Sequence, residues 1–524
     1  MKLSALPGRP ILLGALTLAG TILPGAVPAA FAQLAATQDE PATHIAHIEN
    51  GLLPSAIIKG QPPATMKLTD RMQHYHVPGV SIAFFDHGQI IWTRAYGFAD
   101  LETRRAVTPD TLFQAGSISK PIAALGALRL VEQGKLHLDT NINDTLTSWH
   151  LPDNQYTAEQ KVTLRRILSH SAGLTMHGSS GYAAGAPLPT IPQILDGQKP
   201  ANNEAVRVDT IPGTAFRYSG GGYVIMQLMM TDVTGQGFPT LMHSLVLSPL
   251  GMAHSTYQQP LPPNLATNAA VPYDGKGDPI RGGAHTIPEM AVGGLWSTPS
   301  DLARAAIEVQ QAYAGTSHKL LSQPMAHETL TPQIATRGLG FELSPSGTVP
   351  RFWHFGVNVG YDSVLQAYRD SGQGIAIMTN GQQGEQLMNE ILRAVAREYN
   401  WPDFRPAEHA LIPIDPTTLL AFTGTYTLPN PDGQDKPDKL TITARNNHLY
   451  LAGSYSVGTI YHFTLSDPVE LLPTAAQEFF TFSTGATTFR FEKNASGAIE
   501  SCIIASGSSQ RQATRIPPST KQQP

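Results

Sequence analysis

The segment "FQAGSISKPIAALGALRLVEQGKL", residues 113–136, constrains the fold of this chain more than any other stretch. Its apolar residues recur at helical spacing: Ile122, Ala124, Leu125, Ala127, Leu128 and Val131. Gly134 suits the end of such a helix. The pattern therefore predicts a helix over residues 117–133. Because a helix that is apolar over much of its surface must be buried, we expect a domain to fold around it.

Ser117 and Lys120 stand at the polar start of this predicted helix. Residues three apart share one helix face, so the two side chains are expected to project together. The positive end of the helix dipole lies there, and a partly desolvated lysine beside it loses affinity for its proton. A neutral amine can accept the serine proton and make the oxygen a nucleophile. The alternative is an N-cap serine beside a solvated lysine, and the Ser-x-x-Lys spacing alone leaves both interpretations open.

Two further stretches carry side chains suited to the same chemistry. "IPGTAFRYSGGGYVIMQLM", residues 211–229, places Tyr218 in a glycine-rich turn, where a phenol near a lysine can act as general base and then general acid. "RFWHFGVNVGYDSVLQAY", residues 351–368, places His354 on or near a sheet edge, where it could orient a carbonyl or carboxylate. Each is also open to a structural interpretation, Tyr218 as an aromatic packing residue and His354 as a hydrogen-bonded structural histidine.

Together with "LRRILSHSAGL" and "AVGGLWSTPSDLAR", these stretches resemble in their order the motifs of the serine β-lactamase and penicillin-binding protein superfamily. The resemblance covers roughly residues 60–400 and is greatest to the class C β-lactamase-related branch, which includes DD-peptidases, D-aminopeptidases and esterases. It implies an α+β fold, with an antiparallel sheet flanked by helices and an all-helical region. It also suggests that His170 supports the site rather than reacting.

The resemblance implies a role for each matching residue. Ser117 is the expected nucleophile, Lys120 its activating partner, and Tyr218 the proton shuttle to and from the leaving group. His354 and Gly356 are expected to bind or orient the substrate, with His354 at the position of the lysine of Lys-Thr-Gly.

The same resemblance implies that the backbone N–H groups of Ser117 and Val357 form an oxyanion hole, worth about 2.7–4 kcal/mol per donor. No metal ion or organic cofactor is expected, because serine, amine, phenol and oxyanion hole complete an acyl-enzyme cycle.

Two positions depart from the family's motifs. Gly220 stands where the second motif usually has an asparagine that would hold a substrate amide. His-Phe-Gly replaces Lys-Thr-Gly, which removes a permanent cation from the carboxylate site. Both changes put efficient β-lactam hydrolysis in doubt and leave the acyl-enzyme chemistry intact.

The leading hypothesis is therefore an exported Ser-x-x-Lys serine hydrolase. It would act through an acyl-enzyme on a small ester or amide, whether a peptidoglycan-type D-peptide, an ester or a β-lactam. The alternative is a catalytically inactive binding or sensor protein on the same scaffold. The loop of residues 172–205 is expected to shape the pocket, and Trp296 and Tyr361 are expected to line the cleft or pack in the core.

The N-terminus has the pattern of an export signal. Two basic residues precede an apolar stretch, residues 11–27, and a small-x-small pattern follows at residues 30–32. Glycines and prolines interrupt the stretch, which suits a removed signal better than the alternative, a membrane anchor. We predict a signal peptide over residues 1–32 and a periplasmic or secreted protein, with no stable membrane insertion after its removal.

Composition excludes other classes of function. With 35 basic and 40 acidic residues the formal net charge is −5, which does not suit a nucleic-acid partner. The single cysteine, Cys502, cannot form an internal disulfide and is expected in a strand as a small apolar residue. "HYH", residues 74–76, lacks companion acidic ligands and is expected to be surface histidines. The expected partner is a small-molecule or peptide substrate, and the oligomeric state stays open.

A proline-rich stretch, residues 401–416, divides the predicted domains. Residues 33–410 are expected to form the β-lactamase-like domain, and residues 417–520 a small all-β, lipocalin-like domain, either barrel or sandwich. Hairpin turns are predicted at Asn446-Asn447 and at residues 494–497. In the first domain the pattern predicts strands within residues 80–100 and 374–381, and helices within residues 160–170, 220–234 and 385–400.

Overall fold

The computed structural model describes residues 41–428, 437–457, 461–482, 487–506 and 509–517. The predicted signal peptide lies outside these ranges. Among the helices that are described, none combines the length and the apolar character needed to cross a membrane.

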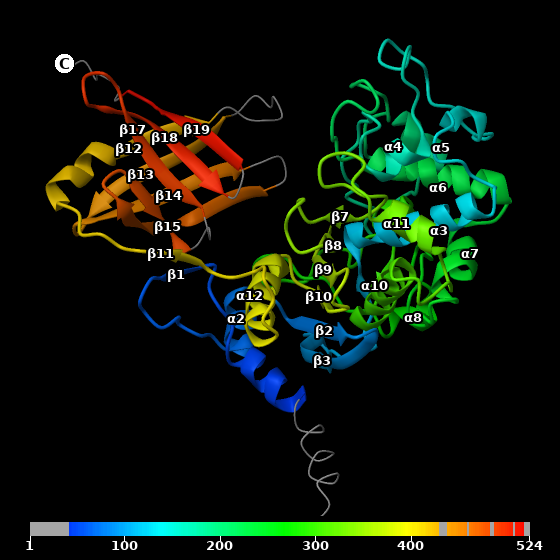
Figure 1. The fold of residues 1–524 in the computed structure, drawn as a ribbon, viewed down its shortest axis with the longest axis horizontal. Coiled ribbons are helices and arrows are strands. Elements are labelled where there is room, and N and C mark those ends of the chain that lie inside the picture. The colour runs from blue at the N-terminus through cyan, green and yellow to red at the C-terminus, as the bar shows by residue number, and fades with distance from the viewer. Residues whose placement is uncertain (1–40, 429–436, 458–460, 483–486, 507–508, 518–524) are drawn as a thin grey trace, which may run out of the picture. The chain divides into compact units, whose positions relative to one another are not determined.

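The central element is a seven-stranded sheet in the order β4-β3-β2-β10-β9-β8-β7, with every neighbouring pair antiparallel (Figure 1). Its strands are β4 Arg105–Ala106, β3 Gln89–Asp100, β2 Gly79–Asp86, β10 Gly374–Thr379, β9 Tyr361–Tyr368, β8 Arg351–Asn358 and β7 Glu342–Leu343. The hairpin predicted within residues 80–100 and the strand predicted at 374–381 are confirmed. The turn between β2 and β3 uses His87 and Gly88 at positive φ, 48° and 74°.

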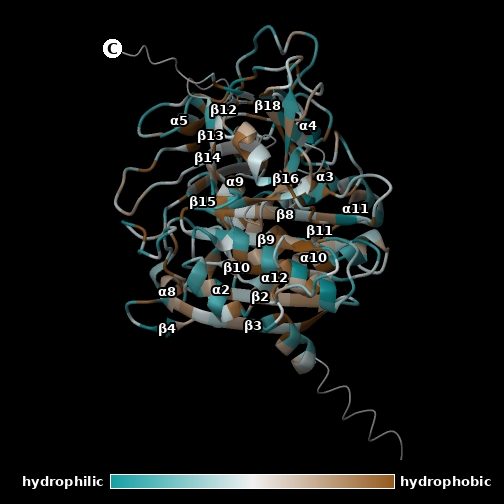
Figure 2. Ribbon diagram, turned by 90° about the vertical axis from the view of Figure 1, so that its left-hand side faces the viewer, coloured by the Kyte–Doolittle hydropathy of each residue, from teal (hydrophilic) through white to brown (hydrophobic). Residues whose placement is uncertain are grey.

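Alternation along the strands divides the apolar residues between two cores. Phe84 faces one core and Phe85 the other, and Ile375 and Ala376 divide in the same way. Helices α12 Gly384–Glu398 and α2 Leu68–His74 cover the first face, whereas α10 Pro299–Tyr313 covers the second. Figure 2 shows the apolar and polar residues along these elements. The predicted helix at 385–400 is thus confirmed as α12, within two residues at its end.

The second core continues into a helical region around α3 Ser119–Glu132. Its other helices are α4 Leu164–Leu168, α5 Ile191–Asp196, α6 Gly220–Thr234, α7 Phe238–Met242, α8 Pro263–Ala266, α9 Met290–Gly293 and α11 Gln323–Thr329. Short elements complete it: β5 Phe113–Gln114 pairs with β6 Trp296–Ser297, η1 spans Gly116–Ile118, η2 spans Ile142–Asp144 and the π-helical η3 spans His243–Leu247. The buried helix that the sequence predicted is α3, and α6 matches its predicted range.

Two predicted helices differ from the observed ones. The helix expected from residue 117 begins at Ser119, because Gly116 at φ +52° starts a tight 3₁₀ turn before it. The helix expected within 160–170 is only α4: the side chain of Thr163 caps its start, and it ends before His170, which adopts φ +54°.

The C-terminal strands close into an eight-stranded barrel, which decides between the predicted barrel and sandwich. They are β12 Gly424–Leu428, β13 Asp438–Arg445, β14 His448–Val457, β15 Tyr461–Ala475, β16 Glu478–Phe480, β17 Thr488–Lys493, β18 Ile499–Ser506 and β19 Ser509–Arg515. The predicted Asn446-Asn447 turn joins β13 to β14 with both residues at positive φ. Cys502 is buried in β18, as expected.

The stretch predicted as a linker holds two further elements. Within it, β11 Ala407–His409 pairs in parallel with β1 Ala56–Ile58, so the segment is partly ordered as sheet. The 3₁₀ helix η4, Pro416–Phe422, leads into the barrel, and Leu419 and Phe422 belong to its core. The exact domain boundaries stay a prediction.

Candidate active site

Ser117 and Lys120 meet at the junction of η1 and α3. The Lys120 Nζ donates a hydrogen bond to Ser117 Oγ over 2.9 Å and a second to the carbonyl of Val292, on α9, over 3.0 Å. The second bond fixes the amine beside the hydroxyl. The contact expected from the Ser-x-x-Lys spacing therefore exists, although Ser117 precedes the α-helix rather than lying in its first turn.

The Lys120 side chain is fully buried, with no exposed surface. Burial removes water from the ammonium form and lowers the pKa of Lys120 to about 7. Near neutral pH a large fraction of the amine is therefore uncharged, and an uncharged amine has a lone pair that can accept the Ser117 proton.

Tyr218 lies on the other side of the pair. The Lys120 Nζ is 5.0 Å from the centre of the Tyr218 ring. Desolvation raises the pKa of Tyr218, and the polar influence of the Ser117 side chain opposes the rise only in part. The phenol therefore keeps its proton at neutral pH. Its position before α6 is set by Ser219, whose side chain caps that helix at Gly222.

From His354 onward, β8 has no partner strand on one side among the described strands. Strand β7 pairs only with Phe352 and Trp353, so among the described strands no partner continues the sheet beyond them on that side. His354 is 3% exposed, and burial together with the positive charge of Lys120 lowers its pKa to about 3. It is therefore neutral, and the prediction that it lies on or near a sheet edge is confirmed.

Gly356 allows β8 to lie against the start of η1. A Cβ at Gly356 would come within 1.9 Å of the carbonyl oxygen of Ala115, and one at Gly116 within 2.4 Å of the backbone nitrogen of Val357. Only glycine fits at either position. This close approach brings the backbone of Val357 beside the residue that precedes Ser117, where the sequence predicted the two oxyanion donors.

His170 packs between the tyrosines of this cluster. Its ring stacks on that of Tyr218 at 4.3 Å and lies 5.2 Å from that of Tyr223. Its Nδ1 accepts from the backbone N–H of Ser219, so the neutral ring carries its proton on Nε2. Burial, then the charge of Lys120, lowers its pKa well below the usual value. His170 thus holds the Tyr218 ring in place, which agrees with its expected supporting role.

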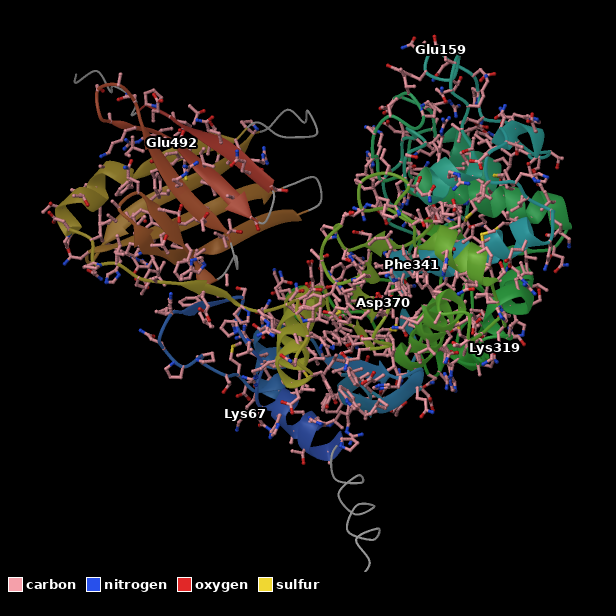
Figure 3. All side chains as sticks on the ribbon, in the orientation of Figure 1. Lys67, Glu159, Lys319, Phe341, Asp370 and Glu492 are labelled. Atoms are coloured by element: carbon pink, nitrogen blue, oxygen red, sulfur yellow. The ribbon has the colours of Figure 1, made fainter. Side chains whose placement is uncertain are left out.

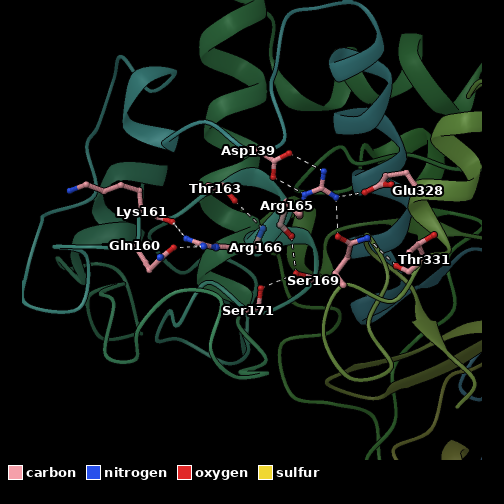
Figure 4. Close-up of polar contacts among 11 residues, drawn as sticks. Asp139, Gln160, Lys161, Thr163, Arg165, Arg166, Ser169, Ser171, Glu328 and Thr331 are labelled. Carbon is pink, nitrogen blue, oxygen red and sulfur yellow. Dashed lines mark hydrogen bonds and ion pairs between the residues drawn. The ribbon is translucent and has the colours of Figure 1, made fainter. Parts of the chain in front are cut away.

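A charged cluster fixes the loop that carries His170 (Figure 4). Arg165, on α4, donates to both carboxylate oxygens of Asp139 over 2.7 and 2.9 Å and also pairs with Glu328. The Ser169 hydroxyl donates to the carbonyl of Arg165 over 2.9 Å, and it also contacts the Ser171 hydroxyl. Arg165 also donates to Gln333 over 2.9 Å, which ties α4 to the loop after α11.

The loop after α11 also brings an ion pair to the site. The sequence pattern did not predict this pair. Arg337 stacks over the ring of Phe216 at 4.3 Å and pairs with Glu342, both side chains being largely buried. Glu342 directly follows Phe341, which is labelled in Figure 3 and whose side chain is buried. The charge of Arg337 lowers the pKa of His354, His170 and Tyr218, and that of Glu342 raises the pKa of Tyr218, so both act on the same cluster. The two-residue strand β7 leaves no periodic signal in the sequence, which explains the miss.

The remaining sequence candidates lie elsewhere. His74 and His76 are exposed, as expected, and no cluster of three or more potential metal ligands occurs in the described part of the chain. Trp296 and Tyr361 are buried and pack edge to face at 5.8 Å. A Cβ at Gly220 would meet Val292 Cγ1 at 3.1 Å and the carbonyl of His177 at 3.3 Å, so these groups fill much of the space of a longer side chain.

Comparison with known proteins gives concordant results. A family profile described as Beta-lactamase matches residues 66–399. Penicillin-binding protein 4 of Amycolatopsis lactamdurans is 27% identical over 381 residues, covering 68% of this chain and 94% of that protein. Protein flp of Staphylococcus aureus (strain N315) is 24% identical over 243 residues, 44% of this chain, and the chain spans only 43% of its length.

Two solved structures illustrate the likeness of fold. The octameric penicillin-binding protein homologue from Pyrococcus abyssi superposes with a TM-score of 0.53 at 19% identity, covering 85% of this chain and 98% of that one. The D-amino acid amidase from Ochrobactrum anthropi SV3 superposes with a TM-score of 0.50 at 24% identity, covering 63% and 97%.

Proposed function

The chain belongs to the β-lactamase family, and from this premise we propose that it is a serine hydrolase that forms an acyl-enzyme on Ser117. The observation that carries the proposal is the hydrogen bond from the buried amine of Lys120, whose pKa of about 7 leaves a large fraction uncharged near neutral pH, to the Ser117 hydroxyl. Its penicillin-binding-protein relative, aligned over most of both chains, supports it.

In the acylation step, Ser117 Oγ bonds to the substrate carbonyl carbon while its proton passes to Lys120 Nζ. The phenol of Tyr218 is already protonated, so Lys120 rather than a tyrosinate is the first base. Negative charge develops on the carbonyl oxygen, and the backbone N–H groups of Ser117 and Val357 are the donors proposed to stabilise it.

Collapse of the intermediate breaks the bond from the carbonyl carbon to the leaving group. Tyr218 donates its proton to the departing oxygen or nitrogen and recovers one from the Lys120 ammonium. Water then attacks the acyl-enzyme, and protons move along the same path in the reverse direction. The carboxylic acid product leaves, and Ser117 regains its proton.

The electrostatics favour an uncharged ester or amide over a substrate that carries a carboxylate. His354 is neutral at the position where a lysine would bind a carboxylate, and Glu342 neutralises Arg337. Burial also takes part of the positive charge from Lys120 near neutral pH. A substrate carboxylate would lose its water without gaining the unpaired cation that the motif lysine would supply, which is unfavourable. Uncharged esters and amides are therefore the substrates we propose, ahead of β-lactams and C-terminal D-peptides.

We also propose that the predicted signal peptide, residues 1–32, directs this activity out of the cytoplasm, to the periplasm or the medium. Identification of the mature N-terminus by mass spectrometry in the exported fraction tests this assignment. A mature protein that keeps residues 1–32 in the cytoplasm would overturn it.

The function itself is tested with a fluorophosphonate probe and Ser117→Ala. The intact protein should be labelled on Ser117, as located by peptide mass spectrometry, and should hydrolyse uncharged p-nitrophenyl esters. Ser117→Ala should keep its thermal transition and lose both labelling and turnover. Absence of labelling in the intact, folded protein would instead favour the inactive binding or sensor protein, and full turnover by Ser117→Ala would refute the nucleophile.

A further inference from the structure

A cavity of about 430 Å³ has no role in the chemistry described above. It lies between the loop of residues 183–188 and the segments around residues 259–261, 269–272 and 283–286. Its walls are formed mainly by small and apolar side chains, among them Ala184, Leu188, Leu261, Ala270, Ala284 and Trp296. A pocket so lined suits an uncharged, apolar group.

Hydrogen bonds connect this cavity to the reacting groups. Gln114, three residues before Ser117, donates through Nε2 to the carbonyl of His285, which lines the cavity, over 2.8 Å. Its Oε1 accepts from the side chain of Asn358 over 2.7 Å, and Asn358 directly follows Val357 on β8. Gln114 and Asn358 thus link one wall of the cavity to the end of β8 that holds Val357.

Trp296, in the wall of this cavity, carries an unused hydrogen-bond donor. Trp296 is 2% exposed and lines the cavity, yet its indole Nε1 has no hydrogen-bond partner among the described residues. A buried indole N–H without a partner is costly, and most buried tryptophans satisfy this group. An acceptor oxygen on a bound molecule would satisfy it.

We propose that this cavity binds the acyl portion of the substrate, and that it selects an apolar acyl chain that carries one acceptor oxygen. The inference rests on the proposed serine hydrolase function and adds the substrate class. With the ester carbonyl beside Ser117 and Val357, an acyl chain that passes Asn358 enters the cavity. The leaving group then points away from it, toward Tyr218.

The test compares p-nitrophenyl acetate, butanoate, hexanoate and octanoate, together with 4-oxopentanoate, on the full-length protein. The intact enzyme should show a higher kcat/KM for butanoate and hexanoate than for acetate, and should prefer 4-oxopentanoate to hexanoate. Ala284→Phe fills the cavity and should lower kcat/KM for hexanoate by at least about tenfold while acetate changes less than about twofold. Ala158→Phe, on an exposed loop outside the cavity, is the matched control and should change neither.

Ala184→Phe at the exposed rim repeats the test if Ala284→Phe folds poorly, and Trp296→Phe should remove the preference for 4-oxopentanoate. If the filling variants change kcat/KM for acetate and hexanoate equally, or change neither, the cavity is not the acyl site. The proposed function would still hold in that case, provided that hydrolysis depends on Ser117. Loss of all Ser117-dependent labelling and turnover in the intact protein would instead remove the proposed function and this inference with it.

Discussion

The interior around Ser117 and the interior of the C-terminal barrel are both buried, but they are built on opposite principles. The barrel core is almost entirely apolar, and its tyrosine Tyr426 satisfies its hydroxyl by donating to the carbonyl of Phe422 over 2.7 Å. The candidate site buries Lys120, His170 and His354, with pKa values shifted by burial and by one another. Ionisable groups that are costly to bury mark the candidate site, whereas the barrel core consists of apolar side chains whose packing stabilises the fold.

Among the substitutions that test this contrast between the candidate site and the barrel core, we expect Lys120→Met to have the largest effect. Turnover should fall by at least about 10³-fold because Ser117 loses its base. The same variant should be more stable at pH 6, by about 1–4 kcal/mol, because replacing a desolvated amine by an apolar side chain removes a folding cost. Kinetics and chemical denaturation measure the two effects.

The gain in stability should depend on pH with a definite sign. The pKa of Lys120 is about 7 in the fold against the usual 10.5, so between these values the unfolded chain binds more protons. The free-energy cost of burying the Lys120 amine is therefore greatest below about pH 7 and declines toward pH 10. The gain in stability from Lys120→Met should decline over the same range. Lys319→Met, at an exposed lysine on the outside of the molecule in Figure 3, should change neither activity nor stability. A Lys120→Met protein that is active, or is destabilised at every pH, would break the comparison.

A change in the barrel core should have the converse effect. Phe491 is 2% exposed and packs on Tyr426 and Phe479. Phe491→Ala should lower the free energy of unfolding by about 3–5 kcal/mol, because it removes apolar contacts and leaves a cavity. The activity of each folded molecule should stay the same, as measured by active-site titration with the fluorophosphonate. A loss of kcat in fully folded Phe491→Ala would show that the barrel takes part in the chemistry.

A smaller effect is expected at the ion pair beside the site. Glu342→Gln would leave the charge of Arg337 uncompensated and should raise kcat/KM for a carboxylate-bearing ester relative to its neutral analogue. A three- to tenfold change in this ratio corresponds to about 0.7–1.4 kcal/mol. Glu328→Gln, which removes a carboxylate paired with Arg165 instead, is the control. An unchanged ratio would show that Arg337 does not influence substrate charge preference.

The sequence predicted those parts of the molecule whose determinants lie close together in the chain. The contact of Ser117 with Lys120 follows from a spacing of three residues, and the two-asparagine hairpin of the barrel follows from residues that tolerate positive φ. The 3₁₀ turn at the start of α3 was missed because it depends on the close packing of Gly116 against Val357, which comes from a distant strand.

Other features depend wholly on pairing between distant segments. Arg337 and Glu342 become neighbours of Tyr218 only through the loop after α11 and the two-residue strand β7. Gln114 on β5 and Asn358 on β8 meet through their side chains although β5 pairs with β6, and closure of the barrel requires β12 to pair with β19. Short strands carry little periodicity, so nothing in the local pattern indicates these contacts.

The central claim is that an uncharged Lys120 amine activates Ser117, and the pH dependence of Ser117 labelling tests it most directly. The rate constant for covalent labelling by an uncharged fluorophosphonate should rise about tenfold per pH unit below about pH 7 and level off above it, because only the neutral amine accepts the serine proton. A rate that keeps rising toward pH 10, or one that does not depend on pH between 5 and 9, would contradict the account.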